Sequence, residues 1–123
     1  MSLMISMNNY EEELSKALMG ANWHPKVEYD WDQDKEIPIK GEWEKSSGNN
    51  GYNKISIIHN DKGSFIQYST YEIKSNKMHS NHIETSFIKI NINNIDCISF
   101  EEDNQKADIY IILKDNEGSM RLS

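Results

Sequence analysis

The sequence contains little cysteine, no long apolar run and few alanines, and each shortage excludes or indicates something. A single cysteine, Cys97, leaves no internal disulfide, and the first residues have neither the basic start nor the apolar stretch of a secretory signal. The longest apolar run is Ile109–Leu113, whereas a membrane-spanning helix needs about 20 residues. These features predict a cytoplasmic protein that does not enter a membrane. Scarce Ala beside abundant Asn and Ile indicates an AT-rich genome, such as that of a low-GC bacterium.

Basic side chains are also in deficit. Lys and Arg number 13 against 20 Asp and Glu, which gives a formal net charge of −7. No two basic residues are adjacent, so the chain lacks the basic stripe with which proteins bind phosphate backbones. We therefore expect neither nucleic acid nor an anionic membrane as a partner. A basic protein surface is a better partner, because complementary fields steer encounter; the alternative is that the charge only keeps the protein soluble.

Motifs for catalysis and cofactor binding are missing from the sequence. The 6 glycines form neither a GxGxxG nor a P-loop pattern, and there is no GxSxG elbow. Asp96 precedes Cys97 and disfavours a thiolate, so Cys97 is interpreted as a core residue rather than a nucleophile. His24, which lies between Trp23 and Pro25, is interpreted as a turn residue. The sequence thus predicts a protein that is not an enzyme and has no cofactor.

The length predicts one domain, residues 1–123, that needs neither disulfide nor metal to fold. Residues 1–7 are interpreted as disordered or as a leader derived from expression. Residues 8–19 form the one convincing helix in the sequence, capped by Asn8 or Asn9 and ended by Gly20 in a left-handed conformation. Its apolar stripe consists of Tyr10, Leu14, Ala17 and Leu18.

From Lys26 onward, apolar residues recur at alternate positions, which predicts antiparallel strands. The clearest hairpin pairs Lys54–His59 with Ser64–Ile73 through an Asn-Asp-Lys-Gly turn. An earlier hairpin flanks the acidic loop Asp32–Glu36, and Ser46–Asn53 is expected to be a mobile loop. The pattern predicts about eight strands. The expected fold class is mainly β (α+β), with one N-terminal helix packed on an antiparallel sheet that is strongly bent or closed into a barrel.

Acidic residues of the first hairpin form the most conspicuous pattern in the chain. Acids at alternate positions begin an EF-hand calcium loop, but that loop requires Gly at its sixth position and Glu at its twelfth. Here those positions hold Lys35 and Gly41, which excludes an EF-hand. A looser hard-cation site and a solvated loop are the two remaining interpretations. The acids are Asp30, Asp32, Asp34 and Glu36.

A second pattern, His79-x-x-His82-x-Glu84, contains ordinary zinc ligands. Its histidines lie in a polar turn that leads into a strand, whereas zincin-type sites place them at i and i+4 on a helix. A zinc site would therefore need a further ligand, such as His59 or His24. We expect no bound metal and retain His79, His82 and Glu84 as the metal-site candidates.

Large aromatic side chains are concentrated in a short segment that contains Trp23, Tyr29, Trp31 and Trp43. Aromatics at alternate strand positions suit the buried face of a sheet, but they also serve as hot spots of protein interfaces. If they are exposed, we expect a binding surface that combines Trp31 and Trp43 with the acids of the first hairpin. That candidate surface is Trp31, Trp43, Asp30, Asp32, Asp34 and Glu36.

Three functions are compatible with these patterns. The leading hypothesis is a non-enzymatic protein-interaction domain that binds a basic partner, for example as an inhibitor or an immunity-type protein. The runner-up is a small-ligand-binding β-barrel whose aromatics line a cavity. The third is a metal-dependent enzyme that uses the acidic loop or the His79/His82 pair. A homo-oligomer is also considered, because a long bare strand such as Ile83–Ile92 invites pairing with a second copy.

Overall fold

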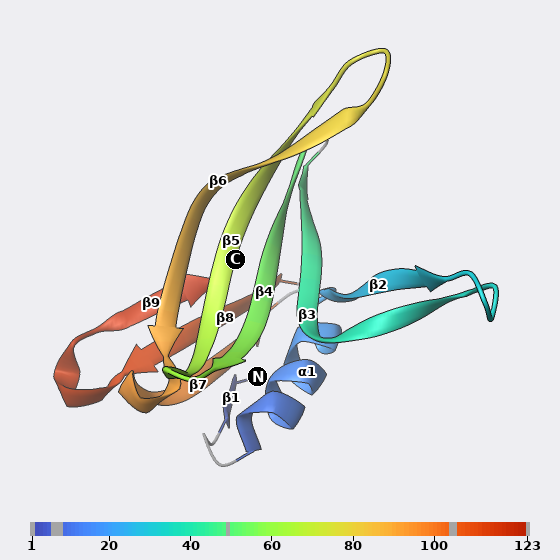
Figure 1. Cartoon of the computed structure of the whole chain (residues 1–123). Helices are drawn as coiled ribbons and strands as arrows, with labels where there is room; N and C mark the ends of the chain where they lie inside the picture. The colour runs from blue at the N-terminus through green and yellow to red at the C-terminus, as the bar shows by residue number, and fades with distance from the viewer. Residues whose placement is uncertain (1, 6–8, 49, 104–105, 123) are drawn as a thin grey trace.

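Strands dominate the fold, which a computed structural model describes for residues 2–5, 9–48, 50–103 and 106–122. Nine strands and one α-helix are present in these residues (Figure 1). They are β1 (Ser2–Ile5), α1 (Tyr10–Gly20), β2 (His24–Asp30), β3 (Lys35–Gly48), β4 (Gly51–Asn60), β5 (Gly63–Ser75), β6 (Ser80–Asn91), β7 (Ile95–Asp103), β8 (Lys106–Leu113) and β9 (Ser119–Leu122), with 3-10 turns at Ile92–Asn94 and Lys114–Asn116. The predicted N-terminal helix and antiparallel strands are thus confirmed.

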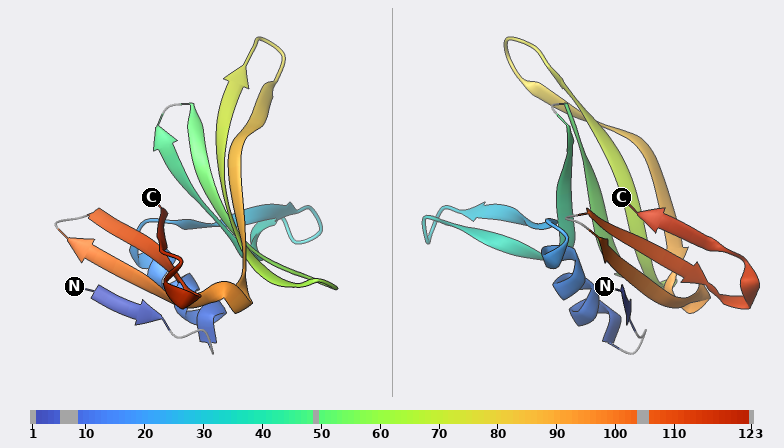
Figure 2. Two further views of the ribbon diagram at one scale, coloured as in Figure 1. Left: turned by 90° about the vertical axis from the view of Figure 1, so that its left-hand side faces the viewer. Right: turned by 180° about the vertical axis from the view of Figure 1, so that it is seen from behind.

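The strands form two antiparallel sheets. A five-stranded sheet has the order β2-β3-β4-β5-β6, and a four-stranded sheet has the order β1-β7-β8-β9. Figure 2 shows the smaller sheet and α1 at one end of the larger sheet, while the other ends of β3 to β6 extend beyond them. Because both strand orders are linear, neither sheet closes on itself within the described residues. The barrel considered in the sequence analysis is therefore not supported.

The core lies where α1 and the two sheets meet. Leu14, Ala17 and Leu18 are buried on one face of α1, as the predicted apolar stripe requires, and Tyr10 packs against them. Such a short helix is marginal in isolation, so its stability comes from this packing. Each large side chain buried here contributes roughly 1.5–3 kcal/mol. The other core residues are Ala21, Trp23, Trp43, Ile55, Ile66, Ile95, Ile98, Phe100, Ile109 and Ile111.

Both ends of α1 differ from the prediction. Asn9 occupies the N-cap position, but its side chain accepts no hydrogen bond from the described amides of the first turn, and Asn8 lies outside the described residues. Gly20 is the last helical residue, and the left-handed conformation falls instead on Asn22, with φ of 66°. Asn adopts this conformation more readily than most residues, so the sequence signal was present two positions later than expected.

Two segments expected to lack structure are strands. Residues Ser2–Ile5, predicted as disordered or a leader, form β1 and pair with β7. The expected mobile loop Ser46–Asn53 is mostly the end of β3 and the start of β4, which pair down to Gly48 opposite Gly51. Ser, Gly and Asn are typical of loops, but their backbones pair as well as any others when neighbouring strands supply the register.

The strongest predicted hairpin is confirmed and is longer than expected. Strands β4 and β5 pair without interruption from Asn60 opposite Gly63 to Gly51 opposite Glu72. Gly63 has φ of 130°, a conformation that favours glycine. The side chain of Asn60 accepts a hydrogen bond from the amide of Lys62 at 2.8 Å, which fixes the turn.

The first hairpin, formed by β2 and β3, is also confirmed, and its outer part leaves the core. The β2–β3 register shifts between Pro25 and Val27, and Gly41 on β3 has φ of 82°. A bulge opposite a left-handed glycine bends both strands at the same level. As a result, the hairpin projects sideways from the rest of the molecule (Figure 1). We call its projecting part, residues 27–39, the arm.

Candidate functional site

The tip of the arm exposes the largest aromatic side chain. Trp31 is 84% exposed, and the ring of Tyr29 meets it edge-on, with centroids 4.5 Å apart and an interplanar angle of 67°. Edge-to-face packing of this kind is favourable between aromatic rings. The pair thus forms an apolar projection that the core of this chain does not cover.

Both faces of the arm are partly apolar. Tyr29 pairs with Glu36, whereas Glu28 pairs with Ile37. Because residues directly opposite one another share a face, Tyr29 and Ile37 lie on opposite faces, and Val27 lies with Tyr29. All three are exposed. A hairpin that is apolar on both faces but packs on neither has surface available for another molecule.

Carboxylates surround this apolar tip. Residues 28–36 include five acids and one base, Lys35, and all are exposed or partly exposed. Asp30 has a structural role, because its Oδ1 accepts hydrogen bonds from the amides of Asp32 at 2.9 Å and Gln33 at 3.3 Å. Asp34 takes the left-handed position of the turn, with φ of 54°. Glu28, Asp30 and Asp32 line one hollow with Trp31, so the tip combines an aromatic surface with negative charge.

The two tryptophans of the predicted binding surface do not lie together. Trp43 is 5% exposed and belongs to the core, as does Trp23. Trp43 pairs with Pro25, and Trp31 lies six residues further along the arm from Pro25, or roughly 20 Å at the rise of a strand. The candidate surface therefore consists of Trp31, Tyr29 and the acids, while Trp43 is a core residue.

Three grooves border the arm. A hollow of about 370 Å³ lies at its tip and is lined by residues that include Glu28, Trp31 and Ile37. A groove of about 500 Å³ separates the base of the arm from α1, with Pro38 and Ser15 on its two sides. Both are surface grooves rather than the interior cavity that the barrel hypothesis predicted.

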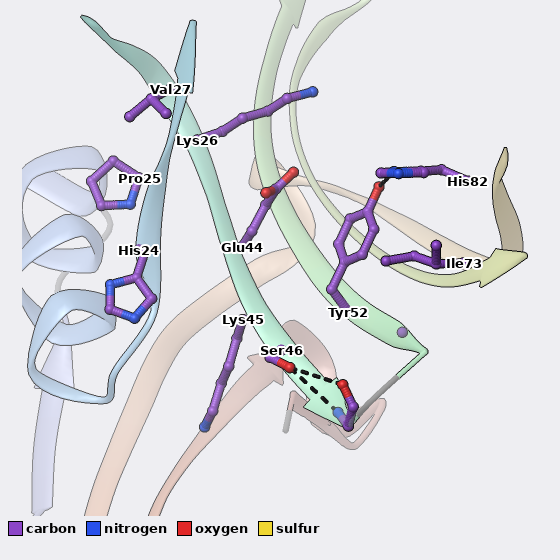
Figure 3. Close-up of a pocket in the computed structure, with 12 residues that line it drawn as sticks. His24, Pro25, Lys26, Val27, Glu44, Lys45, Ser46, Tyr52, Ile73 and His82 are labelled. Atoms are coloured by element: carbon purple, nitrogen blue, oxygen red, sulfur yellow. Dashed lines mark hydrogen bonds between the residues drawn. The ribbon is translucent and has the colours of Figure 1, made fainter. Parts of the chain in front are cut away.

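The third groove lies on the other side of the base of the arm and has a volume of about 680 Å³ (Figure 3). Figure 3 shows Lys26 and Glu44, from β2 and β3, facing Tyr52, Ile73 and His82 from β4, β5 and β6. Its lining combines the charged side chains of Lys26, Glu44 and Lys45 with the apolar Pro25, Val27 and Ile73.

A tyrosine cluster beside this groove was missed by the sequence analysis. The rings of Tyr52 and Tyr71 stack with centroids 4.9 Å apart and an interplanar angle of 7°. The Tyr52 hydroxyl lies 2.9 Å from His82 Nδ1, and the Tyr71 hydroxyl donates to Glu84 Oε2 at 3.0 Å. The signal that could have found them is the register of the β4–β5 hairpin, which places Tyr52 opposite Tyr71 once the pairing is extended past Lys54.

The chemistry of this cluster is that of neutral hydroxyl groups. Burial raises the pKa of both tyrosines, and a nearby carboxylate raises it further, Glu44 for Tyr52 and Glu84 for Tyr71. Both hydroxyls therefore stay protonated at physiological pH and act as hydrogen-bond partners rather than as bases or nucleophiles. The cluster ties three strands together where they extend beyond the smaller sheet.

The predicted metal-site candidates form no ligand cluster among the described residues. His82 and Glu84 are engaged by the tyrosines, and His79 lies in the β5–β6 turn, where its carbonyl accepts from the amide of Asn76 at 3.0 Å. His59, a possible further ligand, contacts Glu11 and Ser64, each at 2.7 Å. Among the described residues, no three His, Cys, Asp or Glu side chains lie close enough together to hold an ion.

Cys97 and His24 are the remaining residues considered for chemistry. Burial, with a contribution from Asp96, raises the pKa of the Cys97 thiol, as expected from its acidic neighbours. Cys97 is partly rather than fully buried. His24 is exposed at the start of β2 and lines the third groove, whereas the sequence suggested a turn.

None of the helices in the described part of the chain has the length and apolar character needed to cross a membrane. The chain matches no protein-family model, no curated protein and no solved structure.

Proposed function

We propose that this protein is a non-enzymatic interaction domain that binds a basic protein partner with its arm. The observation that carries the proposal is the 84% exposure of Trp31 at the end of a projecting hairpin. Trp and Tyr are the residues that most often dominate the binding energy of interfaces. Here both stand on a hairpin whose side chains do not belong to the core.

The charge around Trp31 selects the partner. A Lys or Arg side chain can stack on an indole ring by a cation–π interaction, and the carboxylates of Asp32, Asp34 and Glu36 attract and orient such a cation. An acidic partner would be repelled by the same groups. In its most concrete form, the partner is a basic enzyme or toxin that this protein inhibits by covering its active surface with the arm.

The other two hypotheses have less support. The small-ligand hypothesis requires an enclosed pocket, whereas the grooves near the arm are open to solvent. A metal-dependent enzyme requires ligands brought together, and the described His, Asp and Glu side chains are not grouped in this way. Small-ligand binding and metal-dependent catalysis therefore stay predictions, and the exposed arm supports neither of them.

Affinity capture from the native cell tests the proposal with two matched pairs of variants. Trp31→Ala removes the exposed indole, and Met78→Ala, which removes a large exposed apolar side chain outside both the arm and β6, is its control. Asp32→Lys with Asp34→Lys reverses the charge of the tip, and Glu72→Lys with Glu117→Lys makes the same change of net charge elsewhere.

The expected result is a basic protein retained by the wild type and by both controls but lost by both arm variants. With the purified partner, Trp31→Ala should weaken binding by roughly 30-fold or more, as for a hot spot, and added salt should weaken the wild-type complex. Failure to capture a reproducible partner, or a partner retained by Trp31→Ala, contradicts the proposal.

A further inference from the structure

Strand β6 forms the edge of the five-stranded sheet opposite the arm. It pairs with β5 along its length, and no described strand pairs with its other side. An edge of this kind presents free backbone donors and acceptors to a new strand. Such edges are usually protected by charged residues, proline or a covering segment. β6 contains one lysine and no proline.

Apolar side chains are exposed on both faces of this edge. Ile88 pairs with Tyr68 on the face that carries the core, whereas Phe87 pairs with Ser69 on the open face. Ile88 is 47% exposed and Phe87 is 58% exposed, although both belong to a regular strand. A strand added beside β6 would cover the two side chains at once, one on each face.

The charge of β6 favours a second copy of the same chain as this added strand. The whole chain carries −7, so two copies repel through most of their surfaces. The stretch Ser86–Ile90 of β6 contains no acid and one base, Lys89, so two copies that meet there do not bring acidic groups together. Strand β6 also lies at the opposite edge of the sheet from β2, so the arm stays free to bind a partner.

We propose that β6 pairs antiparallel with β6 of a second copy, with Ile88 opposite its own counterpart. The register follows from the structure of the strand. Pairing with β5 is regular from Ser86 to Asn91 and shifts at Thr85, so a twofold pairing centred on Ile88 uses only regular residues, 86–90. A pairing centred on Lys89 would place two ammonium groups side by side, and one centred on Phe87 would run into the irregular residue.

The proposed register joins compatible side chains. Ile88 meets Ile88 of the partner subunit across the twofold axis, and Phe87 lies opposite Lys89 of the partner subunit. Lys89 already sits 4.5 Å from the centroid of the Phe65 ring on the same face, so it contacts aromatic rings in this environment. Because five paired residues bury less area than a standard interface, the dimer should be weak, with a dissociation constant on the order of 10–100 μM.

Sedimentation equilibrium across roughly 5 μM to 1 mM, a range chosen to bracket this affinity, tests the association directly. Ile88→Lys places two ammonium groups opposite one another and should leave only monomer. Ile83→Lys is the matched control, because Ile83 is 41% exposed on the same strand but lies beyond Thr85, outside the pairing. It should dimerise like the wild type, and circular dichroism should show that both variants are folded. A wild type that stays monomeric, or an Ile88→Lys variant that still dimerises, overturns the proposal.

Disulfide trapping tests the register. In a Cys97→Ser background, Ile88→Cys places the two thiols on opposed residues, whose Cα atoms are about 4.5–5.5 Å apart, within the disulfide range. Ile83→Cys places them roughly 30 Å apart. The Ile88→Cys dimer should therefore form at least about 10-fold faster, because pairing raises its effective concentration. Equal rates overturn the register even if the protein dimerises.

Discussion

Two tryptophans on the same hairpin have opposite environments. Trp43 on β3 is 5% exposed within the core, whereas Trp31, 12 residues earlier in the chain, is 84% exposed at the tip of the arm. The bend at Gly41 separates the two regions: the strand is covered by α1 and the second sheet on one side of it and projects into solvent on the other. One hairpin therefore serves both the fold and, as we propose, recognition.

The largest expected effect comes from truncating the buried tryptophan. Trp43→Ala removes a large side chain from the core and leaves a cavity, so it should lower the free energy of unfolding by about 3–5 kcal/mol. Trp31→Ala should change it by no more than about 0.5 kcal/mol, since the side chain is mostly in solvent. Urea denaturation followed by circular dichroism measures both. Similar losses in the two variants would mean that the arm packs on the body of the protein.

The second effect concerns the bend between the two regions. Gly41→Ala forces a residue with a side chain into φ of 82° and should cost roughly 1–2 kcal/mol. The cost is conformational, because a Cβ at this position would meet Ile57 at an ordinary 3.6 Å. Gly20→Ala is the matched control. Gly20 is helical, and a Cβ there meets nothing within 4 Å in the described structure, so this change should stabilise by up to about 1 kcal/mol.

If Gly41→Ala keeps wild-type stability, the bend does not depend on the left-handed conformation of Gly41. A destabilised Gly41→Ala variant that still exposes Trp31 to a collisional quencher would show instead that the arm projects independently of the bend. Quenching of Trp31 is readable because Trp23 and Trp43 are buried.

Local patterns predicted most of the secondary structure but not the placement of the elements. The helix, the β4–β5 hairpin and the first hairpin follow from apolar periodicity and turn residues, which act over a few positions. That Trp43 is buried and Trp31 exposed depends on where α1 packs, and both residues fit the same alternating pattern. β1 was missed because its pairing partner, β7, lies about a hundred residues later in the sequence.

The candidate site was predicted in part for the same reason. The acids and Trp31 were found because they form a local pattern in one hairpin. The tyrosine cluster joins β4, β5 and β6, and it becomes visible only when their register is known. Sequence alone predicted no bound metal and retained His82 and Glu84 as metal-site candidates; in the structure each has a tyrosine hydroxyl as its partner.

The smallest expected effect concerns the contact between Tyr71 and Glu84. It lies at the end of the five-stranded sheet that extends beyond the smaller sheet. Burial and the carboxylate of Glu84 raise the pKa of Tyr71, so its neutral form is favoured in the folded state. The resulting stability is present below the pKa of the unfolded tyrosine, about 10, and is lost as the pH rises through the higher pKa of the folded protein. Tyr71→Phe should therefore lose less stability than the wild type in this alkaline range, as urea denaturation at a series of pH values would show.

The contribution of Glu84 to the pKa of Tyr71 can be tested separately. Glu84→Gln removes the carboxylate charge but leaves the Tyr71 hydroxyl in place, so an ultraviolet titration should show one tyrosine ionising at lower pH than in the wild type. An unchanged titration would mean that burial alone, and not the contact with β6, sets the pKa of Tyr71.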